Sequence, residues 1–275
     1  MMIIKKVEGY PAPEFDGRVL RVLAHNTVND VDPFLLLDYF ETRDKNFEAG
    51  SWHPHRGIET FTYITRGLMK ENDTINGELQ INAGGALHLS AASGMFHTAV
   101  PSYTEDGIEG FQIWFNIPQK NKMDLPHSSA FQNSAFKHVV KDGNDVKVLI
   151  GEYEDVKGPL DKSNLGLRLL DVSVKEELVL ERQIFKKGFI FVYQGEGLLN
   201  KEEINTQISY VLEEGKYTIK NTGKEDLKFL FAEGVPLNEP IVWRGPIVMN
   251  SQEEILEAYN DLNKDTFIKK ISEEE

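Results

Sequence analysis

The chain of 275 residues contains no cysteine, which excludes disulfides, iron–sulfur clusters and thiol nucleophiles. A bound metal ion would therefore need His, Asp, Glu or water as its ligands. The sequence also lacks an apolar run of about 18 residues, and its apolar N-terminal segment is too short for a secretory signal. We therefore expect no membrane span. The absence of cysteine is compatible with the cytoplasm, which is the expected location.

Basic residues are also scarce. The chain has 30 Lys and Arg residues against 44 Asp and Glu residues, which gives a formal net charge of −14. Direct binding to nucleic acid needs a basic surface that neutralises phosphates, so this composition argues against it. The charge instead favours a soluble protein with a neutral or cationic small-molecule ligand.

The chain is rich in short alternating segments separated by glycine turns, a pattern that predicts an all-β protein of antiparallel barrels. The order of strands and turns in the first half roughly repeats in the second, which indicates two similar β-barrels in tandem. We expect an N-terminal barrel over residues 1–118, a polar linker over 119–145, and a second barrel over 146–275 that includes a C-terminal helix.

The C-terminal helix has the clearest local signal. Ser251 and Glu254 form a capping-box pattern, in which a hydroxyl and a carboxylate satisfy free N–H groups at a helix start. The apolar residues that follow recur at helical spacing. A helix over residues 251–264 is therefore predicted, and the residues expected to pack on a barrel are Ile255, Leu256, Tyr259 and Leu262.

All seven histidines lie in the first half, at positions 25, 53, 55, 88, 97, 127 and 138. Residues two apart on a strand point to the same face, so His53 and His55 can direct both imidazoles at one point. His97 begins a later extended stretch and is the expected third partner. The other histidines are expected to be structural or to face solvent. The second barrel has neither His nor Cys, so we expect one metal per chain, in the first barrel.

Glu59 is the acidic residue nearest to the histidine pair in sequence. On a straight strand its Cα would lie roughly 13 Å from that of His55, at about 3.3 Å per residue. It reaches a metal at the pair only if the backbone bends at Gly57, which a glycine allows.

Four blocks of this sequence together resemble one family. WHPHRGIET at 52–60 is similar to the His-Pro-His-Arg-Gly-x-Glu-Thr signature of pirins, a branch of the cupin superfamily with two cupin barrels. Three further blocks agree in the same order: DPFLLLDYF at 32–40, GFQIWFNIP at 110–118 and EGVPLNEPIVWRGPIVMNSQEEI at 233–255. The resemblance covers most of the chain and implies two cupin-type barrels (a bicupin), the first of which holds a mononuclear iron.

The resemblance also implies a ligand set. In pirins the ligands are the histidines of His-x-His, a later histidine, and a glutamate two residues after it; the first three map onto His53, His55 and His97. The fourth position is Ala99, which cannot ligate, and His88 stands where pirins commonly have tryptophan. Fe²⁺ is the expected metal, although three histidines also suit Zn²⁺, Cu²⁺, Ni²⁺ or Mn²⁺. Either Glu59 or water would take the fourth coordination position of the metal.

Three functions are compatible with this resemblance. The first is a quercetin 2,3-dioxygenase-type oxidoreductase that cleaves a flavonol with O₂, with Glu59 as a ligand or general base. The second is a non-enzymatic, metal-dependent regulatory protein that binds a transcription factor or a metabolic enzyme. The third is a degenerate barrel that binds another ligand. Because three ligands and the barrel blocks are present, the dioxygenase is the leading hypothesis, although Ala99 predicts weak activity.

Overall fold

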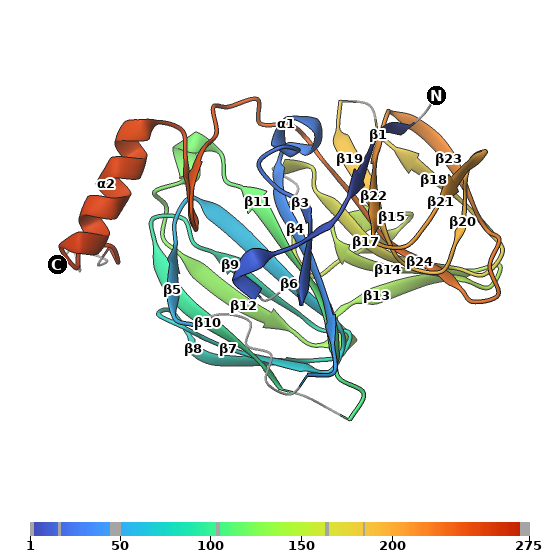
Figure 1. Cartoon of the computed structure of the whole chain (residues 1–275), viewed down its shortest axis with the longest axis horizontal. Coiled ribbons are helices and arrows are strands. Elements are labelled where there is room, and N and C mark those ends of the chain that lie inside the picture. The colour runs from blue at the N-terminus through green and yellow to red at the C-terminus, as the bar shows by residue number, and fades with distance from the viewer. Residues whose placement is uncertain are drawn as a thin grey trace. The chain divides into compact units, whose positions relative to one another are not determined.

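The computed structural model describes residues 3–15, 18–44, 51–102, 105–162, 165–183 and 185–269. The described part consists mainly of antiparallel β-strands, with one longer α-helix near the C-terminal end (Figure 1). This confirms the predicted all-β class. Among these residues, no helix has the length and apolar character that crossing a bilayer requires.

The chain forms two compact units, and each contains two separate stretches of sequence. Unit 1 comprises residues 1–38 and 133–237, and unit 2 comprises residues 39–132 and 238–275. The boundary near the N-terminus falls within strand β4 (Phe34–Thr42).

In unit 1 a large antiparallel sheet is accompanied by a smaller one. The large sheet contains, in spatial order, β1 (Ile3–Glu8), β22 (Ile208–Leu212), β19 (Lys187–Gln194), β24 (Leu227–Gly234), β17 (Arg168–Val174), β14 (Asn144–Ile150) and β13 (Lys137–Lys141). The smaller sheet contains β18 (Glu177–Arg182), β23 (Gly215–Asn221), β20 (Gly197–Leu199) and β21 (Glu202–Ile204). Alternating Val, Leu, Ile and Phe residues from both sheets form one apolar core. The remaining elements are β2 (Tyr10–Pro11), β3 (Val19–Leu23), β15 (Glu152–Tyr153), β16 (Val156–Lys157), the short helix α1 (Val28–Val31) and the 3₁₀ turns Pro13–Phe15 and Asn133–Ala135.

Unit 2 is built in the same way. Its larger sheet contains β12 (His127–Phe131), β9 (Ala86–Ser90), β6 (Ile58–Arg66) and β11 (Ile108–Asn116), followed by the end of β4. Its four-stranded sheet contains β5 (His53–His55), β10 (Met95–Ser102), β7 (Leu68–Asp73) and β8 (Gly77–Asn82). The hairpin of β25 (Val242–Arg244) and β26 (Ile247–Met249), helix α2 (Gln252–Asn263) and the 3₁₀ turn Gln119–Asn121 complete the unit.

These units do not coincide with the continuous ranges expected from the sequence. Strand β1 belongs to unit 1 because it pairs with β22 over residues 208–212. Helix α2 belongs to unit 2 because its apolar side packs with Ile247, Met249 and Phe96. The residues predicted as a linker, 119–145, contain the regular strands β12 and β13. Pairing between strands distant in sequence therefore sets the units, and local composition does not reveal it.

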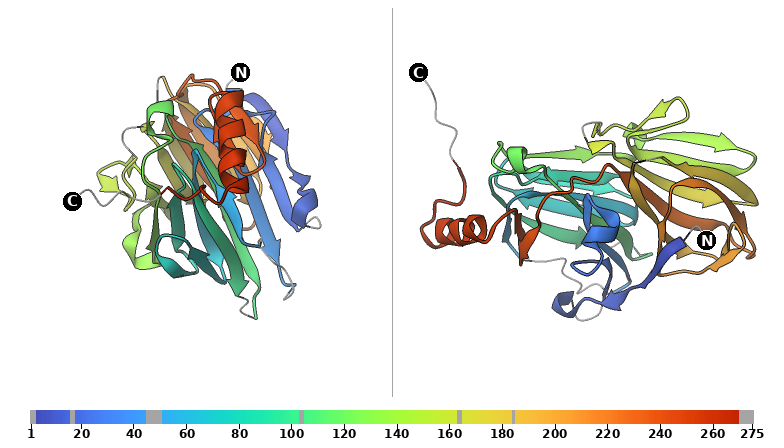
Figure 2. Two further views of the ribbon diagram at one scale, coloured as in Figure 1. Left: turned by 90° about the vertical axis from the view of Figure 1, so that its left-hand side faces the viewer. Right: turned by 90° about the horizontal axis from the view of Figure 1, so that it is seen from above.

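The predicted helix is present as α2, on the outside of unit 2 (Figure 2). Ser251 is its N-cap: the Glu254 N–H donates to Ser251 Oγ at 3.2 Å, and the Ser251 N–H donates to Glu254 Oε2 at 2.9 Å. One part of the packing prediction is wrong. Leu256 is 57% exposed, whereas Ile255 and Ala258 are buried. With about 3.6 residues per turn, positions 255, 258, 259 and 262 share one side, and position 256 turns away from it.

We expect Ser251→Ala to lower the free energy of unfolding by about 1 kcal/mol, since it removes the oxygen that accepts the Glu254 N–H. Chemical denaturation of the parent and the variant measures this difference. Ser251→Asp is the matched control, because its carboxylate can still accept the same hydrogen bond. Equal losses in both variants would contradict a capping role.

Candidate metal centre

The pairing of β5 with β10 brings three histidines together in unit 2. His97 on β10 lies directly opposite His53 on β5, and Met95 lies opposite His55. Directly opposed residues of an antiparallel pair project from the same face, as do residues two apart on one strand. His53, His55 and His97 therefore converge on one side of the small sheet. One nitrogen from each lies within 4.8 Å of the other two.

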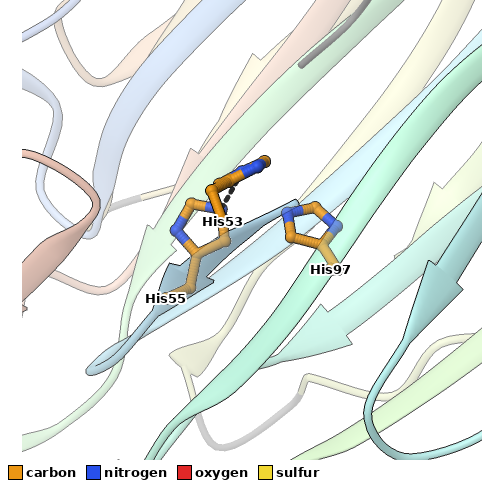
Figure 3. Close-up of side chains that lie close together, drawn as sticks. All are labelled: His53, His55 and His97. Carbon is orange, nitrogen blue, oxygen red and sulfur yellow. Dashed lines mark hydrogen bonds between the residues drawn. The ribbon is translucent and has the colours of Figure 1, made fainter. Parts of the chain in front are cut away.

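The three rings face one another (Figure 3). Their centroids are 4.5 Å apart for His53 and His97, 4.8 Å for His53 and His55, and 4.9 Å for His55 and His97. The Nε2 atoms of His53 and His55 are 3.1 Å apart. Their outer nitrogens are anchored: His53 Nδ1 lies 2.7 Å from the Ser51 carbonyl, and His55 Nδ1 lies 3.1 Å from the Pro246 carbonyl.

This arrangement fits a divalent metal ion. A ring that donates its Nδ1 proton to a carbonyl has an Nε2 lone pair for a metal, and such outer bonds are usual for ligating histidines. Neither ring nitrogen of His97 has a hydrogen-bond partner among the described residues. Two converging Nε2 atoms 3.1 Å apart, next to a buried third ring without hydrogen bonds, are an arrangement that a shared cation would satisfy.

Burial keeps the imidazoles of His55 and His97 neutral. Desolvation, followed by the proximity of His97 and His53, holds the pKa of His55 well below its usual value. Burial likewise lowers the pKa of His97 to about 3. A metal ligand must be the neutral form, so the site favours the protonation state that binds a cation.

Glu59 lies on β6 in the larger sheet and is not a member of this close group. Its Oε2 atom is 2.7 Å from Nε2 of His88, and both side chains are buried. Gly57 does turn the chain between β5 and β6, with φ of +76°. His88, which is 1% exposed, is thus a buried partner of an acid. Of the other histidines outside the cluster, His25, His127 and His138 are exposed, as expected.

Two acids on β7 were missed by the sequence reading. Glu71 and Asp73 are buried, at 2% and 4% exposure, on the face that carries His97. Glu71 Oε2 lies 3.5 Å from His97 Nδ1. The alternation along residues 68–73 could have placed positions 69, 71 and 73 on one face. No local signal, however, pairs that face with residue 97, because this pairing depends on the register of two strands.

Burial, with Asp73 nearby, raises the pKa of Glu71 to about 8. In the metal-free protein the neutral forms of Glu71 and His97 are therefore favoured, and their contact is not an ion pair. A divalent cation at the histidines would attract the ionised carboxylate strongly in such a poorly solvated place.

Aromatic rings border the cluster on another side. The Trp114 ring on β11 lies 5.1 Å from the His55 ring, edge to face, and 5.7 Å from the ring of Trp243. Trp114 is 8% exposed, and its Nε1–H has no hydrogen-bond partner among the described residues. Aromatic rings and one buried N–H donor therefore lie directly beside the histidine cluster.

Two antiparallel units in one chain, one of which carries three converging histidines, are typical of the two-barrel cupin class. Comparison with known families agrees: the family described as Pirin matches residues 16–115, and the Pirin C-terminal cupin domain matches residues 170–268.

Individual relatives cover nearly the whole chain. Pirin of Mus musculus is 30% identical over 259 residues, 89% of this chain and 86% of that protein. A protein of Pseudomonas aeruginosa, named as a candidate quercetin 2,3-dioxygenase, is 30% identical over 267 residues, 92% of this chain and 93% of its own length. The crystal structure of a quercetin 2,3-dioxygenase from Acinetobacter baumannii superposes with a TM-score of 0.86 at 28% identity, covering 97% of this chain and 98% of that chain. This chain belongs to the pirin family.

We expect the protein, purified without a histidine tag, to bind one divalent metal per chain and to lose it in the His53→Ala, His55→Ala double variant. Two ligand nitrogens are lost, and the third cannot hold the ion alone. Elemental analysis after gel filtration measures the stoichiometry. The control removes two exposed histidines, His25→Ala and His138→Ala, and should keep the metal. Metal retained without His53 and His55, or two metals per parent chain, would contradict this site.

Proposed function

We propose that this pirin is a metal-dependent dioxygenase of the quercetin 2,3-dioxygenase type, which cleaves a flavonol with O₂ at His53, His55 and His97. The observation that carries the proposal is the cluster of three converging histidines beside Trp114. The similarity to a quercetin 2,3-dioxygenase of Acinetobacter baumannii over 97% of the chain supports the same chemistry. The proposed compartment is the cytoplasm.

The proposed resident metal is Fe²⁺, held by the three histidines. When bound, the metal would supply a Lewis-acid and redox centre for the reaction of O₂ with the flavonol. The protein's part is to fix the three imidazoles. The carbonyls of Ser51 and Pro246 do this for two of them, because each accepts the proton of an outer nitrogen.

The substrate's flat rings are proposed to stack on the tryptophan side of the site. Trp114 and Trp243 lie with their rings 37° apart and present an aromatic wall next to His55. The unpaired Nε1–H of Trp114 can donate to a flavonol oxygen, and a site that bonds a polar group in this way discriminates against analogues lacking it.

Glu59 is proposed as the base that takes the proton of the reacting flavonol hydroxyl. Its Oε2 lies 2.7 Å from His88 Nε2, and this hydrogen bond would hold the carboxylate in place inside the barrel. A base positioned within hydrogen-bond reach of the proton that it removes contributes typically 10²–10⁴-fold to a rate.

A second candidate is a metal-dependent binding protein without catalysis. The observation that favours it is Ala99, which is buried on the histidine face where pirins have a ligating glutamate. A metal site can survive this change while its reactivity falls. The two functions differ in one measurable property, flavonol turnover by the metal-loaded protein.

We expect Glu59→Gln to lower flavonol turnover by about 10²–10⁴-fold while the chain still binds one metal. The glutamine keeps the shape of the side chain but cannot accept a proton. Oxygen consumption with quercetin and elemental analysis measure the two properties.

Glu78→Gln, the same change at an exposed side chain, is the control and should not alter turnover. Loss of metal in Glu59→Gln would show that Glu59 is a ligand and not the base. A metal-loaded parent that turns over no flavonol would favour the non-catalytic function.

A further inference from the structure

The residue that faces Ala99 across the small sheet is an acid. In the pairing of β10 with β7, Ala99 lies opposite Glu71, and His97 lies opposite Asp73. Ala99 and Glu71 are both buried, at 6% and 2% exposure. Thr98 and Asn72, the next opposed pair along the same two strands, are not buried. Opposed residues share a face, so Glu71 extends over the same interior as His97. A carboxyl group is therefore present on the strand next to the one on which pirins carry their ligating glutamate.

The outer nitrogens of the three histidines follow one pattern. Each is turned toward an oxygen: His53 Nδ1 to the Ser51 carbonyl at 2.7 Å, His55 Nδ1 to the Pro246 carbonyl at 3.1 Å, and His97 Nδ1 to Glu71 Oε2 at 3.5 Å. Figure 3 shows one nitrogen of His97 facing the other two rings and the other facing away. Glu71 thus occupies the place of the third outer acceptor.

The third contact is longer than a formed hydrogen bond, and the other Glu71 oxygen, Oε1, has no partner among the described residues. Burying a carboxyl group without a partner is unfavourable, so another interaction must favour this placement. A cation at the histidines is such an interaction. A shift of about half an ångström would bring Oε2 to the usual N–H···O distance.

We propose that Glu71 is the outer carboxylate of the metal centre: it accepts the Nδ1 proton of His97 and supplies the negative charge that Ala99 cannot. This rests on the proposed metal site. Glu71 acts through His97 and is a positioning residue, not a ligand. Its carboxylate makes His97 a stronger donor and partly neutralises the cation from one imidazole away.

Co²⁺ binding to the metal-free, untagged protein tests this proposal, because the visible spectrum of cobalt reports both affinity and coordination. We expect Glu71→Gln to lower Co²⁺ affinity by about 10–100-fold, the usual cost of losing an outer partner. The number of coordinating groups should not change. Glu78→Gln makes the same chemical change at an exposed position of the β7–β8 hairpin and should bind Co²⁺ as the parent does.

Unfolding of the metal-free variants separates positioning from folding. Because Glu71 Oε1 is buried without a described partner, metal-free Glu71→Gln should be at least as stable as the parent. Weakened metal binding in a protein of unchanged stability supports the proposal. A parallel loss of stability in the metal-free state would overturn it, because Glu71 would then be needed for the fold.

A carboxylate introduced at position 99 provides a further test. Ala99→Glu added to Glu71→Gln should recover most of the lost affinity, since a carboxylate is again next to the cation. Ala99→Glu alone should gain less, because two acids directly opposite each other repel.

Two results would overturn the assignment: Glu71→Gln with parental affinity, or a spectrum in which that variant has lost a direct oxygen ligand. A parent that binds no Co²⁺, Fe²⁺ or Zn²⁺ would instead overturn the metal site itself. Parental metal binding without flavonol turnover would leave the role of Glu71 intact and contradict only the dioxygenase.

Discussion

The histidine cluster depends on the register of one strand, β10, between its two neighbours. On one side His97 lies opposite His53, and on the other Ala99 lies opposite Glu71. Because side chains alternate with a period of two, a slip of one residue would turn His97 to the outside and Thr98 to the inside. No single residue type creates the cluster. It exists because two hydrogen-bonded ladders hold three strands in one alignment.

Much of what holds this alignment comes from the C-terminal segment of unit 2. Gly57, between β5 and β6, approaches Val248 so closely that an added Cβ would lie 2.0 Å from the Val248 carbonyl oxygen. The buried Lys122 ammonium joins the two, donating to the Gly57 carbonyl at 2.7 Å and to that of Val248 at 2.8 Å. Next to them, Arg56 donates to Asp261 at 2.8 Å. The same segment provides the Pro246 carbonyl 3.1 Å from His55 Nδ1, so residues far apart in sequence hold one histidine cluster in place.

The sequence predicts those parts of this structure that depend on local periodicity. The shared direction of His53 and His55 follows from their spacing on a strand, and the start of helix α2 follows from Ser251 and Glu254. Register between strands is a different kind of information, since in the pairing of β10 with β7 it depends on residues 24 to 34 positions apart, such as Ala99 with Glu71. The sequence therefore does not reveal Glu71. It predicts helix α2 itself, but it groups this helix with the second barrel, whereas the helix belongs to unit 2. The predicted burial of Leu256 is wrong for a related reason. Helical spacing defines an apolar face, but it does not show which edge of that face packs against the barrel.

The exchange of a ligand for an outer acid has a chemical consequence. A glutamate at position 99 would occupy one coordination position, and its charge would lie directly on the metal. A carboxylate at position 71 contributes the same charge through the His97 ring, where it still attracts the cation but leaves that position unused. The centre then resembles an open three-histidine site, in which water or substrate can take more than one place. It also remains more electropositive than a histidine–carboxylate site, because the electrostatic effect of the Glu71 carboxylate on the metal decreases with distance. Such a centre should bind an anionic oxygen well and lower the pKa of a hydroxyl that approaches it. The flavonol proposed as substrate has adjacent oxygens of this kind.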